Sequence, residues 1–136
     1  MKYLLDTTTV SRFVQRDDGV LARLALESPV SLAIASITRL EIEYGLRANP
    51  ARARTIGKIV RSFCESIETL AFDAACADRG AQIRAALRAR GTPIGSYDLL
   101  IGATALRHGL AIVTNNVREF ERIDGLQVED WSLPRA

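Results

Sequence analysis

Four acidic residues are candidates for chemistry because of their positions in the sequence. Asp6 ends the apolar run "YLL", and Asp98 opens the apolar stretch "DLLIGA". Glu41 lies in "SITRLEIEYG", and Glu119 lies in "NNVREF", which follows another apolar run. Carboxylates that a fold brings together repel one another unless a cation lies between them, and an all-oxygen set of ligands suits Mg²⁺ or Mn²⁺. Such an ion lowers the pKa of water and stabilises a leaving oxygen.

Other kinds of catalytic site have less support. The two cysteines, Cys64 and Cys76, show no close metal-ligand spacing, so we expect small, buried, reduced thiols rather than a zinc site. The single histidine, His108, stands beside a predicted helix C-terminus, where a positive charge is favourable for structural reasons. No serine or cysteine is recognisably paired with it as a nucleophile.

The acids also have purely structural interpretations. Thr38-x-x-Glu41 matches a capping box, in which the glutamate returns to the backbone of the capping residue. Asp98 falls in the first turn of a predicted helix that Ser96 would cap, where the helix dipole favours a negative charge. Asp6 would accept a hydrogen bond within a turn, and Glu119 would lie on a solvated face. Against this, an unpaired charge beside strongly apolar segments is costly, and both Asp6 and Asp98 have such neighbours.

The elements that must position these acids alternate between strands and helices. We predict strands in "KYLLD", "VSLAIAS", "ETLAF", "LAIVT" and "LQVEDW". Helices are predicted over 8–15, from about 18, over 37–46, 56–67, 74–90 and 97–108, with a short one after "LAIVT". This is an α/β pattern: a parallel sheet flanked by helices. Sites in such folds gather outside the carboxyl ends of the strands, where the four acids would meet.

Several local details are also predicted. The threonines after Asp6 would cap the first helix, and Asp17 or Asp18 the second. Val30 would alternate with Leu32 and Ile34 in the second strand. Ile59 would lie on the apolar face of the helix after Asn49-Pro50, and Asp73 would cap the alanine-rich helix that ends near Gly91.

Composition indicates one globular domain, over residues 1–136. The chain has 48% hydrophobic residues and no stretch that approaches the length of a membrane span, so we expect a soluble, cytoplasmic protein. The formal net charge is +2, and 16 of the 18 basic residues are arginine. If the four candidate acids form a pocket, the remaining surface is more basic than the net charge suggests. Arginine binds phosphates and stacks on unpaired bases, which suits an RNA substrate.

The chain resembles a PIN-domain ribonuclease, specifically the VapC toxins of type II toxin–antitoxin pairs. The matching segments are "YLLDTTTV", "SITRLEIEYG", "GTPIGSYDLLIGATALRHGLAIVTNNVREF" and "GLQVEDW". The resemblance implies a PIN-like fold and a Mg²⁺-dependent endoribonuclease. It implies that Asp6 and Asp98 coordinate Mg²⁺, with Mn²⁺ as an alternative, and that Glu41 is the third acid.

The fourth position is open. Many PIN domains have an aspartate where this chain has Asn116, whereas the "TNNxREF" pattern of similar VapC proteins uses its glutamate, here Glu119. Thr8 stands where the family usually has asparagine. We interpret Thr8 and Asn116 as supports of the acidic pocket, and the catalytic set as Asp6, Glu41, Asp98 and Glu119.

The resemblance also implies partners. These are a structured RNA, often a tRNA cut in its anticodon region, a cognate VapB antitoxin whose tail occupies the groove near the site, and a second copy of the chain in a homodimer. Alternate residues of "LEIEYGL", namely Leu40, Ile42, Tyr44 and Leu46, are candidates for partner contacts, with core packing as the alternative.

Two other functions have partial support in the sequence. "LLDTTTV" superficially resembles the nucleophile motif of haloacid-dehalogenase-type phosphatases, but the second aspartate of that motif is Thr8 here, and neither lysine is well placed. The stronger rival is a non-catalytic, arginine-rich module that binds RNA or a partner and has a degenerate acidic pocket. A Mg²⁺-dependent RNase assay separates it from the nuclease.

Overall fold

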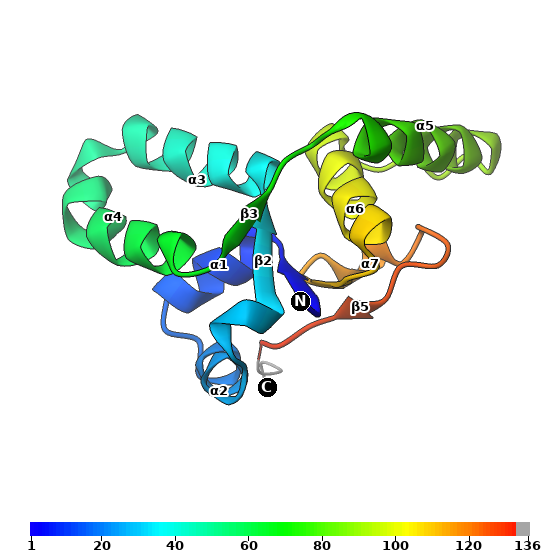
Figure 1. The fold of residues 1–136 in the computed structure, drawn as a ribbon. Coiled ribbons are helices and arrows are strands. Elements are labelled where there is room, and N and C mark those ends of the chain that lie inside the picture. Colours follow the sequence, from blue (N-terminus) through cyan, green and yellow to red (C-terminus); the bar gives the residue numbers. More distant parts are fainter. Residues whose placement is uncertain (133–136) are drawn as a thin grey trace.

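A five-stranded parallel sheet forms the centre of the protein, as the sequence predicts (Figure 1). The structure is a computed structural model that describes residues 1–132. The predicted domain runs to residue 136, and its last four residues lie outside the described ones. The strand order is β3-β2-β1-β4-β5, with bounds β1 Tyr3–Leu5, β2 Leu32–Ala35, β3 Glu68–Leu70, β4 Ala111–Val113 and β5 Val128–Glu129.

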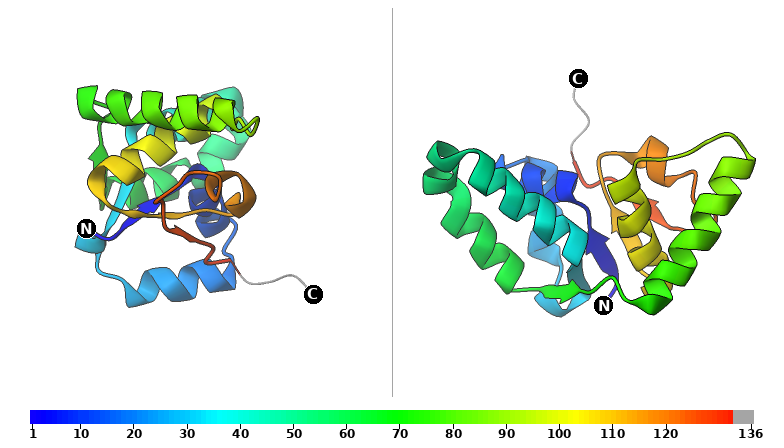
Figure 2. Two further views of the ribbon diagram at one scale, coloured as in Figure 1. Left: turned by 90° about the vertical axis from the view of Figure 1, so that its right-hand side faces the viewer. Right: turned by 90° about the horizontal axis from the view of Figure 1, so that it is seen from above.

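Helices cover both faces of the sheet. They are α1 Thr7–Val14, α2 Asp18–Leu26, α3 Ser36–Ala48, α4 Pro50–Glu65, α5 Ala74–Ala89, α6 Ser96–His108 and α7 Val117–Phe120. Two helical arms, α3 with α4 and α5 with α6, diverge from the sheet in both Figure 1 and the right-hand view of Figure 2. Within residues 1–132, no helix is long and apolar enough to cross a membrane.

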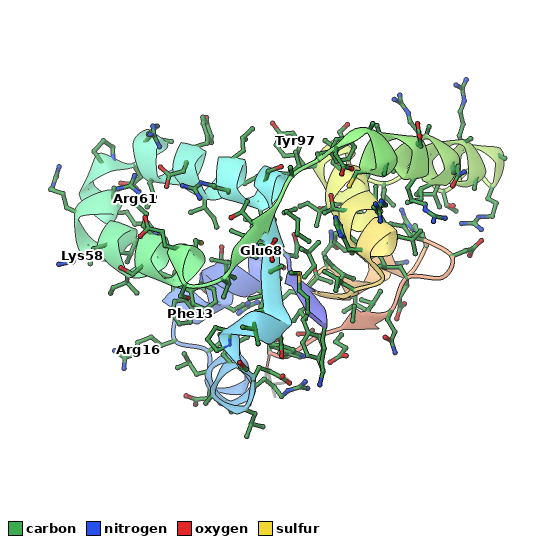
Figure 3. The ribbon with its side chains drawn as sticks, viewed as in Figure 1. Phe13, Arg16, Lys58, Arg61, Glu68 and Tyr97 are labelled. Atoms are coloured by element: carbon green, nitrogen blue, oxygen red, sulfur yellow. The ribbon has the colours of Figure 1, made fainter. Side chains whose placement is uncertain are left out.

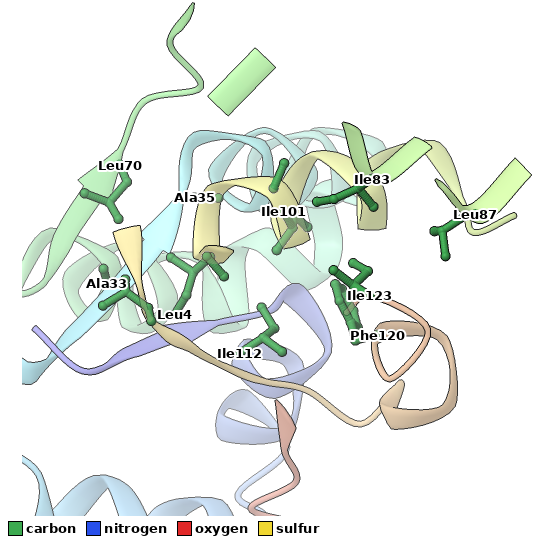
Figure 4. Packing of buried hydrophobic residues seen from close by; sticks show 13 residues of the cluster. Leu4, Ala33, Ala35, Leu70, Ile83, Leu87, Ile101, Ile112, Phe120 and Ile123 are labelled. Atoms are coloured by element: carbon green, nitrogen blue, oxygen red, sulfur yellow. The ribbon is translucent and has the colours of Figure 1, made fainter. Parts of the chain in front are cut away.

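The core consists of one apolar cluster on each face of the sheet. Leu4 belongs to the cluster with α5, α6 and α7, whereas Leu5 belongs to the cluster with α1, α2, α3 and α4. Figure 4 shows Leu4, Ile112 and Phe120 in the first cluster. Successive strand residues point to opposite faces, so a strand covered on both sides is apolar throughout. The helices are thereby fixed against both faces of the strands whose ends carry the site.

The second strand shows this most clearly and corrects a prediction. All four residues of β2 are buried, so it does not alternate between buried and exposed positions. Val30 lies in the short 3₁₀ turn Pro29–Ser31 and is 78% exposed. The predicted alternation of Val30 with Leu32 and Ile34 is therefore wrong, because both faces of this central strand are covered by helices.

The helix starts confirm some predicted caps and correct one. Asp17 caps α2 and Asp73 caps α5, each accepting a backbone N–H from the first turn. The first helix is capped by Asp6, which accepts the N–H of Thr7, and not by the threonines. The strand-end acid therefore also anchors the helix that follows it.

The fourth helix differs from the prediction at one position. Ile59 is 57% exposed and lies with Lys58 on the outer side of α4, so its predicted burial is wrong. Figure 3 shows Lys58 and Arg61 on this arm. Cys64 and Cys76 are both free and buried, as predicted.

Candidate active site

Asp6 lies at the carboxyl end of β1 and is held by neighbours from two strands. Its Oδ1 accepts the N–H of Thr7 at 2.7 Å. Its Oδ2 accepts the hydroxyls of Thr114, at 2.7 Å, and Thr8, at 3.1 Å. Thr114 follows β4, so the pairing of β1 with β4 sets these contacts. Asp6 is only 2% exposed.

Burial and hydrogen bonding act on Asp6 in opposite directions. Burial raises the pKa of the Asp6 carboxyl, because a charge loses its hydration there, and the bonds from Thr114, Thr7 and Thr8 partly offset that rise. The hydroxyls thus stabilise the ionised form that an ion or a substrate would meet. The Thr8 hydroxyl therefore contacts the Asp6 carboxylate directly.

Asp98 and Glu119 are joined by a single amide. The Asn116 Nδ2 donates to Asp98 Oδ2 at 2.9 Å and to Glu119 Oε2 at 3.1 Å. The second Glu119 oxygen, Oε1, accepts the backbone N–H of Gly95. Asp98 is in the first turn of α6, and Glu119 is on α7. Asn116 and Glu119, the two candidates for the fourth position, are therefore bonded to each other, and Asn116 also bonds Asp98.

Glu41 reaches the site from α3 and not through a capping box. Its Oε1 accepts the hydroxyl of Thr7 at 2.6 Å. The helix is capped by Ala35 without a side-chain bond, and Thr38 is fully buried within its first turns, 3.4 Å from the Thr7 hydroxyl. The capping-box interpretation is wrong because the helix begins earlier than that motif requires.

The Asp98 cap also differs from the structural interpretation. Gly95, not Ser96, is the capping residue of α6, and it provides no side-chain bond. A Cβ at Gly95 would lie 3.3 Å from Glu119 Oε1 and 3.9 Å from Asp98 Oδ2. A side chain here would fill space next to both carboxylates, so the glycine leaves that space free.

Asp98 shows that the acids form one electrostatic group. Its pKa is raised to about 6, first by burial and then by the charges of Asp6 and Glu119, with a smaller effect from Glu41. The pKa of Glu119 is lowered, chiefly because the Gly95 N–H stabilises its charge. Among residues 1–132, none of the four acids makes a salt bridge with lysine or arginine. The negative charge is therefore poorly compensated.

The donor set fits a hard divalent cation in its chemistry. All four acids supply oxygen, the ligand that Mg²⁺ and Mn²⁺ prefer, and the glycine leaves room beside two of them. As placed, no three His, Cys, Asp or Glu side chains in the described part of the chain form a closed ligand set. Instead, each acid is held by its own partners. Threonine hydroxyls bind Asp6, Thr7 binds Glu41, and Asn116 joins Asp98 to Glu119.

Sequence reasoning missed three contributors to this site. Thr7 and Thr114 bind Glu41 and Asp6, and Gly95 binds Glu119 through its backbone. Thr114 had a usable signal, because a polar residue directly follows the buried strand "AIV", as Asp6 follows β1. Gly95 had none, since a backbone N–H is available at almost any residue.

Comparisons with known proteins identify the family of this chain. A model of the PIN domain family matches residues 3–126. The chain belongs to the PIN-domain family. A curated relative, the tRNA(fMet)-specific endonuclease VapC of Salmonella typhimurium, is 39% identical over 96% of this chain and 98% of its own length. Ribonuclease VapC2 of Rickettsia felis is 32% identical over 96% of this chain and 98% of its own length. Within the PIN-domain family, the chain is thus a member of the VapC group.

Solved structures of the same PIN-domain group have this fold. The chain in DNA-bound VapBC from Salmonella typhimurium matches with a TM-score of 0.88 and 39% identity, over 96% of this chain and 98% of that one. VapBC2 from Rickettsia felis, bound to a promoter DNA fragment, matches with a TM-score of 0.88 and 30% identity over 97% and 100%. The predicted fold and family are confirmed.

The four partner-contact candidates on α3 divide into two kinds. Leu40 and Tyr44 are 50% and 70% exposed, as a partner contact requires. Leu46 is buried, and Ile42 packs against the same apolar cluster, so both contribute to the core. The outer side of α3 is therefore the part that remains available to a partner.

Proposed function

We propose that this chain is a Mg²⁺-dependent endoribonuclease toxin that hydrolyses phosphodiester bonds in a structured RNA. The observation that carries the proposal is the group of four acids at the carboxyl edge of the sheet. Burial and the neighbouring carboxylates raise the pKa of Asp98 to about 6, and none of the four acids makes a salt bridge with lysine or arginine among the described residues. Membership of the PIN-domain family adds support.

In this proposal Asp6 and Asp98 hold the cation, which supplies the positive charge that activates water and stabilises the leaving oxygen. Thr8 and Thr114 stabilise the ionised form of Asp6 and orient its carboxylate through their bonds to Oδ2. Glu41 and Glu119 are the two candidates to orient the attacking water. Asn116 fixes the distance between Asp98 and Glu119.

The proposed substrate class is tRNA. The Salmonella relative is named as a tRNA(fMet)-specific endonuclease, which supports this class without assigning the species of tRNA. A polar groove beside the site is lined by Thr8, Ser11, Arg12, Gln15 and Asn115. Arg12 is thus placed to bind a phosphate of a chain whose scissile bond lies at Asp6. An RNA target of this kind would put the enzyme's action in the cytoplasm.

The proposed protein partners are a VapB-type antitoxin and a second copy of the chain. The Salmonella and Rickettsia structures are of VapBC complexes, which supports the antitoxin. An apolar groove between α1, α3 and α4 includes Glu41 and Arg52 in its lining and suits an antitoxin tail that blocks the site. The exposed Leu40 and Tyr44 suit a homodimer contact.

Cleavage of purified tRNA, with analysis of the new ends, tests the function. We expect cleavage that requires Mg²⁺ and leaves a 5′-phosphate and a 3′-hydroxyl, because water attacks the phosphorus. Ends with 2′,3′-cyclic phosphate would indicate attack by the neighbouring hydroxyl and would rule out the hydrolytic mechanism. RNA binding without cleavage in Mg²⁺ or Mn²⁺ would instead support the non-catalytic module.

A further inference from the structure

A further groove lies between α5 and α6, where α6 begins close to Asp98. Its walls include the apolar side chains of Leu87, Pro93, Ile94 and Leu99, and its volume is about 420 Å³. We call it the α5–α6 groove. The groove has an apolar wall and is open to solvent, so one face of an unpaired base could pack against the wall while its other face stays accessible.

Two arginines border the α5–α6 groove without partners of their own. Arg84 and Arg88 lie one helical turn apart on α5, and both are exposed. In the described part of the chain, neither side chain makes a salt bridge or a hydrogen bond. Two adjacent guanidinium groups without a carboxylate are complementary to phosphate.

Nearby arginines behave differently and show what a structural role looks like here. Arg90 donates to Asp124 Oδ2 at 2.8 Å and to the carbonyl of Arg122 at 2.6 Å. Arg122 donates to the carbonyl of Pro93 at 2.9 Å. These two residues fasten the loop over 91–95, which forms one wall of the α5–α6 groove, so the groove is held in shape by contacts that leave Arg84 and Arg88 unused.

The same loop connects the α5–α6 groove to the acids. Pro93 and Ile94 line the groove, and the next residue, Gly95, donates its N–H to Glu119. Ser96 also lines the groove, and Asp98 follows two residues later. A chain whose phosphodiester bond lies at Asp98 therefore has its neighbouring nucleotide within reach of the groove.

We propose that the α5–α6 groove binds one unpaired nucleotide of the RNA next to the scissile phosphate. The base lies on the apolar wall, and Arg84 and Arg88 stack on its ring and contact its phosphate. This inference rests on the proposed function for its substrate class and makes the groove a specificity site. A protein segment in the same groove is the competing occupant.

Binding measured in EDTA tests the inference separately from catalysis. The probe is a fluorescently labelled tRNA anticodon stem-loop, compared with a blunt RNA duplex of equal phosphate number. We expect Arg84→Gln with Arg88→Gln to weaken stem-loop binding about tenfold, in the range of one lost stacking contact. Arg16→Gln, which removes an exposed arginine on the opposite side of the molecule (Figure 3), should change it by less than about twofold.

A second measurement identifies the base contact. Stem-loops with one abasic position each should bind the unaltered protein more weakly at one loop position, and the Arg84→Gln/Arg88→Gln protein should lose that dependence. Equal effects of the groove and Arg16 variants, or equal losses on the duplex, would overturn the inference. So would a change of the groove variant's oligomeric mass, which would mark the groove as a protein contact. Failure of all RNA cleavage would count against the proposed function, while the binding result would still decide the groove.

Discussion

Glu43 and Asp98 are two carboxylates in opposite electrostatic surroundings. Glu43 on α3 accepts bonds from Arg61 at 3.0 Å and pairs with Arg47, so its pKa is lowered to about 2. Asp98 has carboxylates and an amide as neighbours, and its pKa is raised to about 6. The chain has 16 arginines, so the lack of a salt bridge at the acids is a property of the site and not of the composition.

The difference indicates which carboxylate needs a positive charge from a ligand. At Glu43 the protein's own arginines supply the positive charge, and the bond from Arg61 links α3 to α4. At Asp98 the protein leaves the charge for a ligand, at a cost to its own stability. A site that is less stable without its ligand is typical of a functional position.

The largest expected effect is on catalysis. Asp98→Asn or Asp6→Asn should lower Mg²⁺-dependent RNA cleavage by about 100-fold or more, because each removes a charge proposed to hold the ion. Glu43→Gln is the matched control and should retain near-normal activity. Initial rates of tRNA cleavage with folded proteins provide the measurement. Full activity of either Asn variant would show that its carboxylate is no more important for cleavage than that of Glu43.

A smaller effect concerns the pair joined by Asn116. Glu119→Gln should lower the cleavage rate by about tenfold more than Asn116→Ala, because an amide neither neutralises a cation nor accepts a proton near neutral pH. Single-turnover rates at saturating Mg²⁺ provide the test. A dead Asn116→Ala with a near-normal Glu119→Gln would mean that the amide organises the site and the glutamate is dispensable.

The smallest effect is on stability, and it has opposite signs at the two carboxylates. The folded-state pKa of Asp98 exceeds its ordinary value of 3.8, so its contribution to the free energy of unfolding is lost as pH rises through about 6. Asp98→Asn should therefore raise the Tm of the metal-free protein near neutral pH. The gain is about 1 kcal/mol after allowance for partial exposure of the carboxylate, and it should vanish below pH 3.8.

Glu43→Gln should do the reverse. The lowered pKa of Glu43 adds stability above its ordinary value of 4.5, and this contribution is lost as pH falls toward 2. The substitution should thus lower the Tm slightly near neutral pH, by less than ~1 kcal/mol for so exposed a pair. Thermal unfolding of both variants across pH gives the comparison. Shifts of the same sign near neutral pH would contradict it.

Sequence patterns located most of the fold because its signals are local. Short apolar runs marked the five strands, and acids just past Leu5 and near "LAIVT" pointed to the carboxyl edge of a parallel sheet. Gly109, in the left-handed region with φ of 66°, ended α6 as predicted. Such features depend on a few neighbouring residues, which a single sequence contains.

What sequence could not provide depends on contacts between distant segments. The Thr7–Glu41 bond joins residues 34 positions apart, and the Thr114–Asp6 bond spans 108. The Thr38-x-x-Glu41 motif suggested a local partner for Glu41, but the actual partner comes from α1 across the sheet edge. Burial of Thr38 likewise depends on how α3 packs, and Val30 is exposed because it lies in the 3₁₀ turn that precedes β2.

The central claim is that the acids at the sheet edge bind a divalent cation, and calorimetric titration with Mn²⁺ tests it most directly. Metal-free protein, Asp98→Asn and Glu43→Gln should be titrated side by side near neutral pH. We predict saturable binding to the unaltered protein and to Glu43→Gln, with proton release because Asp98 is partly protonated near its pKa of about 6, and loss of binding in Asp98→Asn. Equal binding by all three proteins, or none by the unaltered protein, would contradict the account.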